Sequence, residues 1–354
     1  MNPVLYSKGQ RVFNTNGLGV LSDCVTCKAT EVLNKEYEIE MTLSKNGNNA
    51  SKIDVDQIVL VKANYTDGPQ PFRIYSTELD IDGNLKVNAA HWSYDMAGIP
   101  VDAFTAESLT DAVTNMNANQ LTTQQTQFLL STDFESEGEM KVTEPKSFKS
   151  LLGDGEGTLI GTYGGEYHYH GFDIELLERR GTDKGICFRY RKNITDFEME
   201  TSSEESYTAV MGFWKKSGSN DEPDTIIKGT IISLYDSGVT VPYDKILIVD
   251  TSDKIKNEND ADATTEQVDE YIQEYIEAND LKLPTYNMKV EYTEDDNIIK
   301  INLGDTVAVL LPEYGVKAYG RCSKVVFDCL LERNESIEIG SVSAGIPEDL
   351  ANII

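Results

Sequence analysis

Segments with strand-like alternation follow one another along most of the 354 residues, and few helical segments separate them. The stretch YEIEMTLS, residues 37–44, alternates apolar and polar residues with the period of two typical of a half-buried β-strand. Similar runs at 72–79 and 84–90 flank the sequence DIDGN, whose Asp-Gly pair is a strong signal for a hairpin turn. Parallel sheets need crossover connections between their strands, so this pattern favours antiparallel pairing. We therefore predict an α+β fold that is mainly antiparallel β.

Two longer helices are expected among these strands. Thr264 and Gln267 form a capping-box pair, and an apolar stripe with helical spacing follows them. The stripe consists of Val268, Tyr271, Ile272, Tyr275 and Ile276. Residues 105–120 show the same spacing behind Thr105, and a short helix is expected within residues 144–157.

The chain exceeds the length at which one hydrophobic core keeps growing, so two or more domains are expected. The prediction has two β-barrel-like lobes, a helix-containing connector, an acidic linker with the amphipathic helix, and a C-terminal antiparallel region that closes the lobes. These segments are residues 1–98 (first lobe), 99–157 (connector), 158–255 (second lobe), 256–285 (linker and helix) and 286–354 (C-terminal region).

Targeting signals and cysteines bear on where the chain is made. No apolar run approaches the roughly 18 residues that span a bilayer. The first residues, MNPVLYSKGQRVF, lack the basic and apolar regions of an export signal, so we expect synthesis in the cytosol with reduced cysteines. Cys24 and Cys27 fit the C-x-x-C spacing, but no second pair accompanies them, so buried structural thiols are predicted.

The charge balance excludes one class of partner. With 31 basic and 60 acidic residues the formal net charge is −29. Such a chain repels phosphate, so binding to the outside of nucleic acid is not expected. The same charge suits a surface that nucleic acid must pass without adhering.

Two of the three histidines lie in the sequence EYHYH, residues 166–170. Glu166, His168 and His170 would project from one face of a β-strand, because side chains at i, i+2 and i+4 do so. Three such ligands with an open fourth position can hold a catalytic zinc ion. The prediction is a plain strand with no metal or other cofactor, and the zinc site is the alternative.

Catalytic motifs are otherwise scarce. Neither the H-E-x-x-H nor the G-x-S-x-G pattern occurs. Asp236 opens the triplet Asp-Ser-Gly, which resembles the loop of aspartic proteases but is also an ordinary hairpin turn. We predict no catalytic residue, with Asp236 as the alternative.

One basic cluster interrupts the acidic sequence. It consists of Arg179, Arg180, Lys184, Arg189, Arg191 and Lys192. In so acidic a chain these side chains are predicted to meet carboxylates of a neighbouring lobe or of another subunit. Arg179, Arg180, Arg189, Arg191 and Lys192 are therefore the interface candidates. A solvated strand-turn-strand segment is the alternative.

A family resemblance covers nearly the whole chain in order. Its densest part is a G-G-E-Y segment, a strand, an R-R-G turn and an R-Y-x-K-N segment. The matching residues are Gly164, Gly165, Glu166, Tyr167, Phe172, Arg179, Arg180, Gly181, Arg189, Tyr190, Lys192 and Asn193. Further similar stretches are NGLGVLSDCVTCKATEVLNKEYEIEMTL, PFRIYSTEL with AAHWSYDM, and LGDTVAVLLPEYGVKAYGRCSKVVFDCLLERNESIEIGS. The chain resembles the prophage tail endopeptidase, or phage minor structural protein, family of siphophages that infect Gram-positive bacteria.

The resemblance implies a hub at the tail tip of a virion, similar to the central hub of contractile phage tails. Such a hub is a homotrimer whose two β-barrel lobes per subunit form a pseudo-sixfold ring. The ring adapts the six-fold tail tube to a three-fold tip and forms the channel through which DNA leaves as transient cargo. The implied partners are the distal tail protein, the tape measure protein and a receptor-binding protein. The protein would be made in the host bacterial cytoplasm.

Two other functions stay open. The family name implies a peptidoglycan endopeptidase that aids cell-wall penetration. The sequence ends at Ile354, so any cutting activity is expected from the hub region itself. His168 and His170 do not belong to the family motif, whereas His91 matches a family position and is expected to pack and hydrogen-bond. The third function is a carbohydrate- or receptor-binding tip, because the many tyrosines could stack on sugars.

Overall fold

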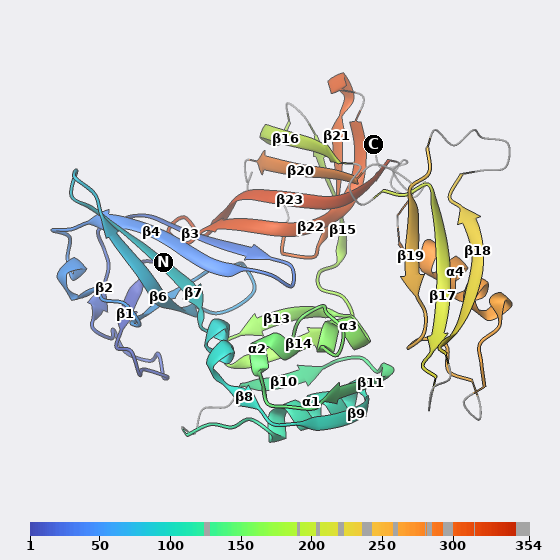
Figure 1. Cartoon of the computed structure of the whole chain (residues 1–354). Helices are drawn as coiled ribbons and strands as arrows, with labels where there is room; N and C mark the ends of the chain where they lie inside the picture. The colour runs from blue at the N-terminus through green and yellow to red at the C-terminus, as the bar shows by residue number, and fades with distance from the viewer. Residues whose placement is uncertain are drawn as a thin grey trace. The chain divides into compact units, whose positions relative to one another are not determined.

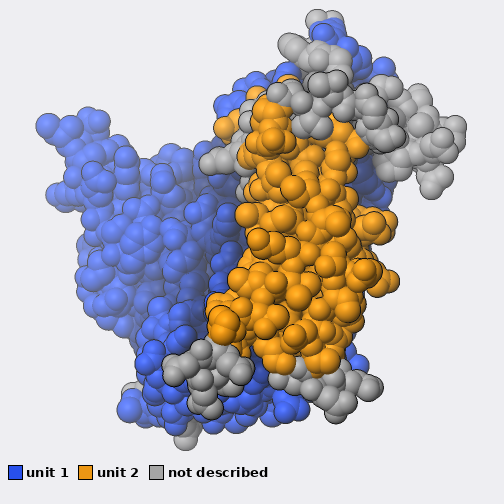
Figure 2. All heavy atoms as spheres, turned by 45° about the vertical axis from the view of Figure 1, so that its right-hand side comes forward, with its two compact units in different colours: residues 1–198, 289–339, 346–354 blue, residues 199–288, 340–345 orange. Residues whose placement is uncertain are grey.

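The structure of the chain is a computed structural model with side chains, and it forms two compact units (Figure 1, Figure 2). The first unit contains Met1–Glu198 and Lys289–Ile339, and the second contains Met199–Met288 and Gly340–Gly345. The structure describes residues 1–123, 128–189, 192–202, 206–218, 223–235, 243–257, 261–279, 281, 285–292, 300–314 and 316–344.

The largest sheet contains thirteen strands of the described residues (Figure 1). Their order is β16-β20-β23-β22-β3-β4-β7-β6-β5-β1-β2, with β21 paired to both β22 and β15 beside this path. The strands are β1 (Val4–Tyr6), β2 (Gly19–Val20), β3 (Cys24–Val32), β4 (Tyr37–Ser44), β5 (Ile58–Val61), β6 (Gln70–Leu79), β7 (Asn84–His91), β15 (Asp183–Arg189), β16 (Ile194–Ser202), β20 (Thr285–Tyr292), β21 (Thr306–Leu311), β22 (Val316–Asp328) and β23 (Arg333–Ala344). The described strands leave this path open and form no closed barrel, whereas the sequence predicted barrel-like lobes.

Local sequence explains the central strands of this sheet. Tyr37, Ile39, Met41 and Leu43 are buried while the residues between them are not, which confirms the period of two predicted for β4. The predicted hairpin at DIDGN also forms, because β6 ends before it and β7 begins at Asn84. The Asp80 carboxylate accepts a hydrogen bond of 2.8 Å from the Asn84 amide and thereby closes the turn.

A smaller group of elements in the first unit follows β7 (Figure 1). Its elements are η2 (Trp92–Gly98), β8 (Pro100–Val101), β9 (Phe104–Ser108), α1 (Leu109–Ala118), β10 (Leu129–Thr132), β11 (Glu137–Val142), β12 (Lys146–Ser147), α2 (Phe148–Leu151), α3 (Leu159–Tyr163), β13 (Glu166–His170) and β14 (Asp173–Leu177). Strands β10, β14 and β13 form a three-stranded sheet. Helix α1 confirms the helix predicted within residues 105–120, but it begins later because residues 104–108 belong to β9 and Ser108 provides the N-cap.

The second unit packs one helix on a three-stranded sheet. The sheet has the order β18-β17-β19. The elements are β17 (Ala209–Lys216), β18 (Thr225–Ser233), β19 (Ile246–Asp250) and α4 (Thr265–Ala278). Thr264 and Gln267 form both hydrogen bonds of the predicted capping box, and Val268 and Ile272 of the predicted stripe are fully buried. Glycine at position 212 lets the helix approach closely, because a Cβ there would lie 2.6 Å from Cγ1 of Ile272.

Strand pairing is mainly antiparallel, as predicted, with three parallel exceptions among the described pairs. The parallel pairs are β10 with β14, β15 with β21, and β17 with β19. No helix among the described residues combines the length and the apolar character needed to cross a bilayer. The division into five segments predicted from the sequence stays a prediction.

Candidate functional site

Strand β13 carries the sequence EYHYH and confirms the strand prediction. Tyr167 and Tyr169 are buried, with their ring centroids 5.8 Å apart. Glu166, His168 and His170 alternate with them and share the other face of the strand. The strand lies at the edge of its three-stranded sheet, and the Asn34 side chain accepts a 2.8 Å hydrogen bond from the backbone amide of Tyr167. Asn34 lies between β3 and β4, so this contact joins the small sheet to the large one.

Glu166 is held by two arginines. Its two carboxylate oxygens lie 2.5 and 2.7 Å from the guanidinium nitrogens of Arg321 on β22. The backbone amide of Arg180 also donates to Oε2 of Glu166, at 2.6 Å. Bidentate pairs between arginine and carboxylate are among the stronger charge-assisted hydrogen bonds. The structure therefore directs Glu166 toward arginines rather than toward the histidines of its own strand.

His168 lies between two carboxylates. Its Nδ1 is 2.8 Å from Oε2 of Glu175, the residue directly opposite on β14. Its Nε2 is 3.0 Å from Oδ2 of Asp67, which lies in the connection between β5 and β6. The hydrogen bond to Asp67 raises the pKa of His168 above its ordinary value, and the contact with Glu175 adds to this effect. Two carboxylate neighbours favour an imidazolium that donates from both ring nitrogens.

Asp67 responds to the same contact in the opposite direction. Burial is the largest single influence on Asp67 and would raise its pKa, but the hydrogen bond and positive charge of His168, together with the hydrogen bond from Asn64, outweigh burial and the pKa is lowered. His170 is more distant, with Nδ1 at 3.9 Å from Oδ1 of Asp67, and its side chain is half exposed. Within the part of the chain that the structure describes, no group of three or more His, Cys, Asp or Glu residues is arranged to hold a metal ion.

Arg180 forms the most deeply buried ion pair of this region. Its Nη1 lies 2.7 Å from Oε1 of Glu31 on β3, and the side chains are 11% and 8% exposed. Nη1 also donates to the backbone oxygen of Tyr167, at 3.0 Å. Burial lowers the pKa of Arg180, but the adjacent Glu31 more than offsets this and the pKa is raised. We call the contacts that Glu166, His168 and Arg180 make with Glu31, Asp67 and Arg321 the junction.

The R-R-G turn that contains Arg180 also packs against the connection that precedes β21. Gly181 has a φ of +74°, and a Cβ on it would lie 2.1 Å from the backbone carbon of Gly304. Asp305 accepts hydrogen bonds of 2.8 Å from the backbone amide of Thr182 and from Nζ of Lys184. Arg179 donates to the Thr306 hydroxyl at 2.6 Å. The glycine is required because the two backbones touch.

The remaining sequence candidates lie elsewhere. Arg189 and Lys192 are exposed, in and after β15. Arg191 and Asp236 lie outside the described residues. Thus Arg179 and Arg180 both make contacts within the chain, whereas the side chains of Arg189 and Lys192 lie exposed at the surface.

His91 packs and hydrogen-bonds, as expected from the sequence. Its ring stacks on Tyr37 with centroids 4.7 Å apart. Nδ1 accepts a hydrogen bond of 3.3 Å from the amide of Ser93, and Nε2 faces Oε1 of Gln70 at 3.3 Å. Complete burial lowers the pKa of His91 to about 3, so this ring stays neutral. Among the cysteines, Cys27 is buried as predicted and Cys24 is half-buried.

Four residues of this region were not predicted by the sequence analysis: Glu31, Asp67, Asp305 and Arg321. Each pairs with a residue more than one hundred positions away in the chain. Single acids and arginines in strands and turns are common, so only the topology of the sheets identifies these partners. Asn34 was not predicted for the same reason, because its partner Tyr167 is also far away in the chain.

No family model matches the sequence, and no match was found among curated proteins. Solved structures do match over the whole chain. The prophage tail protein gp18 from Listeria monocytogenes EGD-e has a TM-score of 0.64 at 13% identity, covering 99% of this chain and 98% of its own. The 43 kDa tail protein of prophage MuSo2 from Shewanella oneidensis has a TM-score of 0.60 at 13% identity, covering 97% and 98%.

The tail protein from Neisseria meningitidis MC58 has a TM-score of 0.59 at 11% identity, covering 98% of this chain and 97% of its own. The TM-scores establish a shared fold, and at identities this low the likeness extends to the fold alone. The chain therefore has the fold of phage tail proteins over nearly its full length.

Proposed function

We propose that this chain is a structural protein of a phage tail, located at the tail tip of the virion. The observation that carries the proposal is the likeness of the fold to tail proteins from three different bacteria, each matched along nearly its whole length. A match over 97–99% of this chain includes nearly the entire architecture rather than one common motif. The family resemblance of the G-G-E-Y and R-R-G segments agrees with this role.

The junction supports a structural role. Four side chains from the large sheet or its turns contact β13 or the residue next to it, namely Asn34, Asp67, Gln70 and Arg321. A fifth, Glu31, pairs with Arg180 in the turn after β14. Buried ion pairs of this kind fix a unique arrangement more than they add stability. Glu166 and His168 of EYHYH are thus engaged in contacts that join the small sheet to the large one.

The finer proposal is a homotrimeric hub with a pseudo-sixfold ring of β-sheet lobes. Such a ring would join the distal tail protein and the six-fold tube to a three-fold tip, beside the tape measure protein and a receptor-binding protein. Three copies at −29 each carry a formal charge of −87. An acidic lumen would repel the phosphates of departing DNA, so that the DNA passes as cargo without adhering.

The solution mass tests the proposal. Light scattering on the purified chain, of 39.4 kDa, is expected to give three times that mass when the chain is alone, or a complex that contains three copies of it when the distal tail protein is added. A chain that stays monomeric in both conditions would contradict the trimeric hub. Incubation of the same fractions with purified peptidoglycan tests the endopeptidase alternative, for which we expect no release of peptide fragments.

A further inference from the structure

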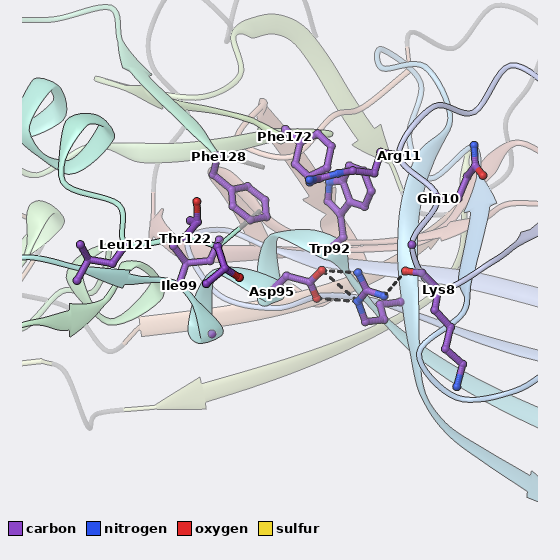
Figure 3. A pocket seen from close by; sticks show the side chains of 14 residues that line it. Lys8, Gln10, Arg11, Trp92, Asp95, Ile99, Leu121, Thr122, Phe128 and Phe172 are labelled. Atoms are coloured by element: carbon purple, nitrogen blue, oxygen red, sulfur yellow. Dashed lines mark hydrogen bonds and ion pairs between the residues drawn. The ribbon is translucent and has the colours of Figure 1, made fainter. Parts of the chain in front are cut away.

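A cleft of about 610 Å³ opens in the first unit beside the loop that follows β1 (Figure 3). This volume lies within the range of small-ligand and peptide-anchor sites. The walls come from that loop, from β6 and η2, from the residues after α1, and from the turn between β13 and β14. The residues that matter for recognition are Arg11, Arg73, Trp92, Asp95, Leu121 and Phe172.

The floor of the cleft is fixed by Arg73. Its Nε lies 2.8 Å and its Nη2 2.5 Å from the Asp95 carboxylate. Its Nη1 donates to the backbone oxygens of Lys8 and Asp56, at 3.1 and 2.8 Å. Arg73 therefore has a carboxylate partner and holds the loop of Lys8 in place. Lys8 itself lies 3.0 Å from the Asp54 carboxylate.

Arg11 differs from its basic neighbours because its guanidinium rests on aromatic rings instead of a carboxylate. The guanidinium carbon is 4.1 Å from the ring centroid of Phe172 and 5.9 Å from that of Trp92. Figure 3 shows the side chain lying across these two rings. Among the described residues, no ion pair or hydrogen bond engages the Arg11 side chain. Stacking orients the planar group while its N–H donors stay open to the cleft.

The charges select the kind of anion. One cation without a carboxylate partner matches a monoanion, and a guanidinium fork matches the two oxygens of a carboxylate. Asp95 stands in the same wall, paired with Arg73, and would repel a phosphate dianion more strongly than a carboxylate monoanion. Burial lowers the pKa of Arg11 and the charge of Asp95 raises it only in part, so a carboxylate partner would offset the remaining cost of desolvating this guanidinium.

The apolar part of the wall favours an apolar side chain next to the bound carboxylate. Leu121 is 50% exposed and lines the cleft together with the half-buried Ile99. Phe128 also lines the cleft. An apolar side chain next to the carboxylate would cover Leu121 and remove its surface from water.

We propose that this cleft binds an acidic peptide segment of a partner protein. Arg11 pairs with one carboxylate of the segment, and Ile99 and Leu121 receive an adjacent large apolar side chain. This inference rests on the cleft alone and does not depend on the role in a phage tail.

Two matched peptides test the proposal on the full chain. Acetyl-Phe-Glu-amide carries one carboxylate beside an aromatic ring, and acetyl-Phe-Gln-amide replaces that carboxylate by an isosteric amide. Titrations followed by ligand-observed NMR measure the affinity of each peptide. The Glu peptide is expected to bind about fivefold more tightly than the Gln peptide, because one partly exposed ion pair contributes an affinity difference of about this size. Equal affinity for the two peptides, or no binding of either, would overturn the proposal.

Variants test whether Arg11 causes the difference in affinity between the two peptides. Arg11→Gln is expected to abolish the difference between the two peptides, and Arg11→Lys to retain part of it because the charge remains without the stacked fork. Arg189→Gln removes an exposed arginine elsewhere and is expected to leave the fivefold ratio unchanged. Loss of the ratio in the Arg189 variant, or its retention in Arg11→Gln, contradicts the assignment. Displacement of the Glu peptide by an equal concentration of inorganic phosphate would show a phosphate site instead.

Discussion

His168 and Asp67 are 101 residues apart in the sequence, and in the fold Nε2 of the imidazole lies 3.0 Å from the Asp67 carboxylate. The pair joins β13 to the connection between β5 and β6. Its partners have opposite shifts, since the pKa of His168 is raised and that of Asp67 is lowered. The charged groups that face His168 are Asp67, Glu175 and Arg180, the last of which lies in the R-R-G turn after β14.

The first prediction concerns the pH dependence of this pair. Because the folded pKa of His168 is raised, its contribution to stability is complete below the unfolded value of about 6.5 and is lost as pH rises through the folded pKa. The contribution of Asp67 holds above its unfolded value of about 3.9 and is lost as pH falls through the lowered folded pKa. His168→Gln is therefore expected to lower the free energy of unfolding by about 1–2 kcal/mol near pH 5.5 and by less near pH 9.

Urea unfolding of wild type and variant across this pH range measures the difference. His170→Gln is the control, because His170 lies 3.9 Å from Asp67 and its side chain is half exposed, so a smaller effect is expected. A difference between wild type and His168→Gln that stays constant from about pH 5.5 to pH 9 would contradict an ionic pair.

The second prediction concerns the buried pair of Arg180 and Glu31. Arg180→Met leaves the Glu31 carboxylate buried without its cation, so the free energy of unfolding should fall by about 3–5 kcal/mol. The double variant Arg180→Met, Glu31→Leu removes both charges and should recover part of that loss. Urea unfolding of the two single variants and the double variant gives the coupling. Additive losses would show that the two side chains act independently.

The third prediction uses two glycines with positive φ. Gly181→Ala places a Cβ 2.1 Å from the backbone of Gly304, so both strain and overlap should reduce stability, together by about 3 kcal/mol. Gly185 has a φ of +65° and open space around it, so Gly185→Ala should cost only about 1 kcal/mol of strain. Thermal unfolding compares them. Equal losses would mean that the contact between the two loops contributes nothing.

The fourth prediction concerns the second unit. Thr264 accepts the hydrogen bond from the Gln267 amide that begins α4. Thr264→Ala should destabilise the second unit by about 1 kcal/mol, whereas Thr264→Ser keeps the acceptor and should change stability by less than about 0.5 kcal/mol. Hydrogen exchange of the α4 amides detects the difference. Similar protection in the Ala and Ser variants would argue against a role for the cap.

Local sequence was sufficient wherever a feature depends on neighbours in the chain. The alternation in β4, the turn after Asp80 and the capping box at Thr264 all form as predicted, because periodicity and hydrogen bonds within a few residues decide them. The sequence predicted that α1 starts near Thr105, but Thr105 belongs to β9, where it pairs with Lys141 of β11. A tertiary pairing thus overrode a local preference.

Partners that are far apart in the chain could not be predicted in this way. The EYHYH strand was recognised, yet nothing near it indicates that Glu166 meets Arg321 or that His168 meets Asp67. The parallel pairing of β15 with β21 was equally hidden, since Met199–Met288 of the second unit lie between these two strands in the chain. The resemblance of the R-R-G segment located the right residues without revealing that Gly181 touches Gly304.

The two tryptophans of the sequence are divided between the units. Trp92 lies in the wall of the cleft beside Arg11, and Trp214 lies in the core of the second unit, where its Nε1 donates to the backbone oxygen of Ile255. Each unit therefore contains its own intrinsic fluorophore. In a chain with Trp214→Phe, Trp92 would be the one remaining tryptophan, so tryptophan fluorescence would report both the unfolding of the first unit and the occupation of its cleft.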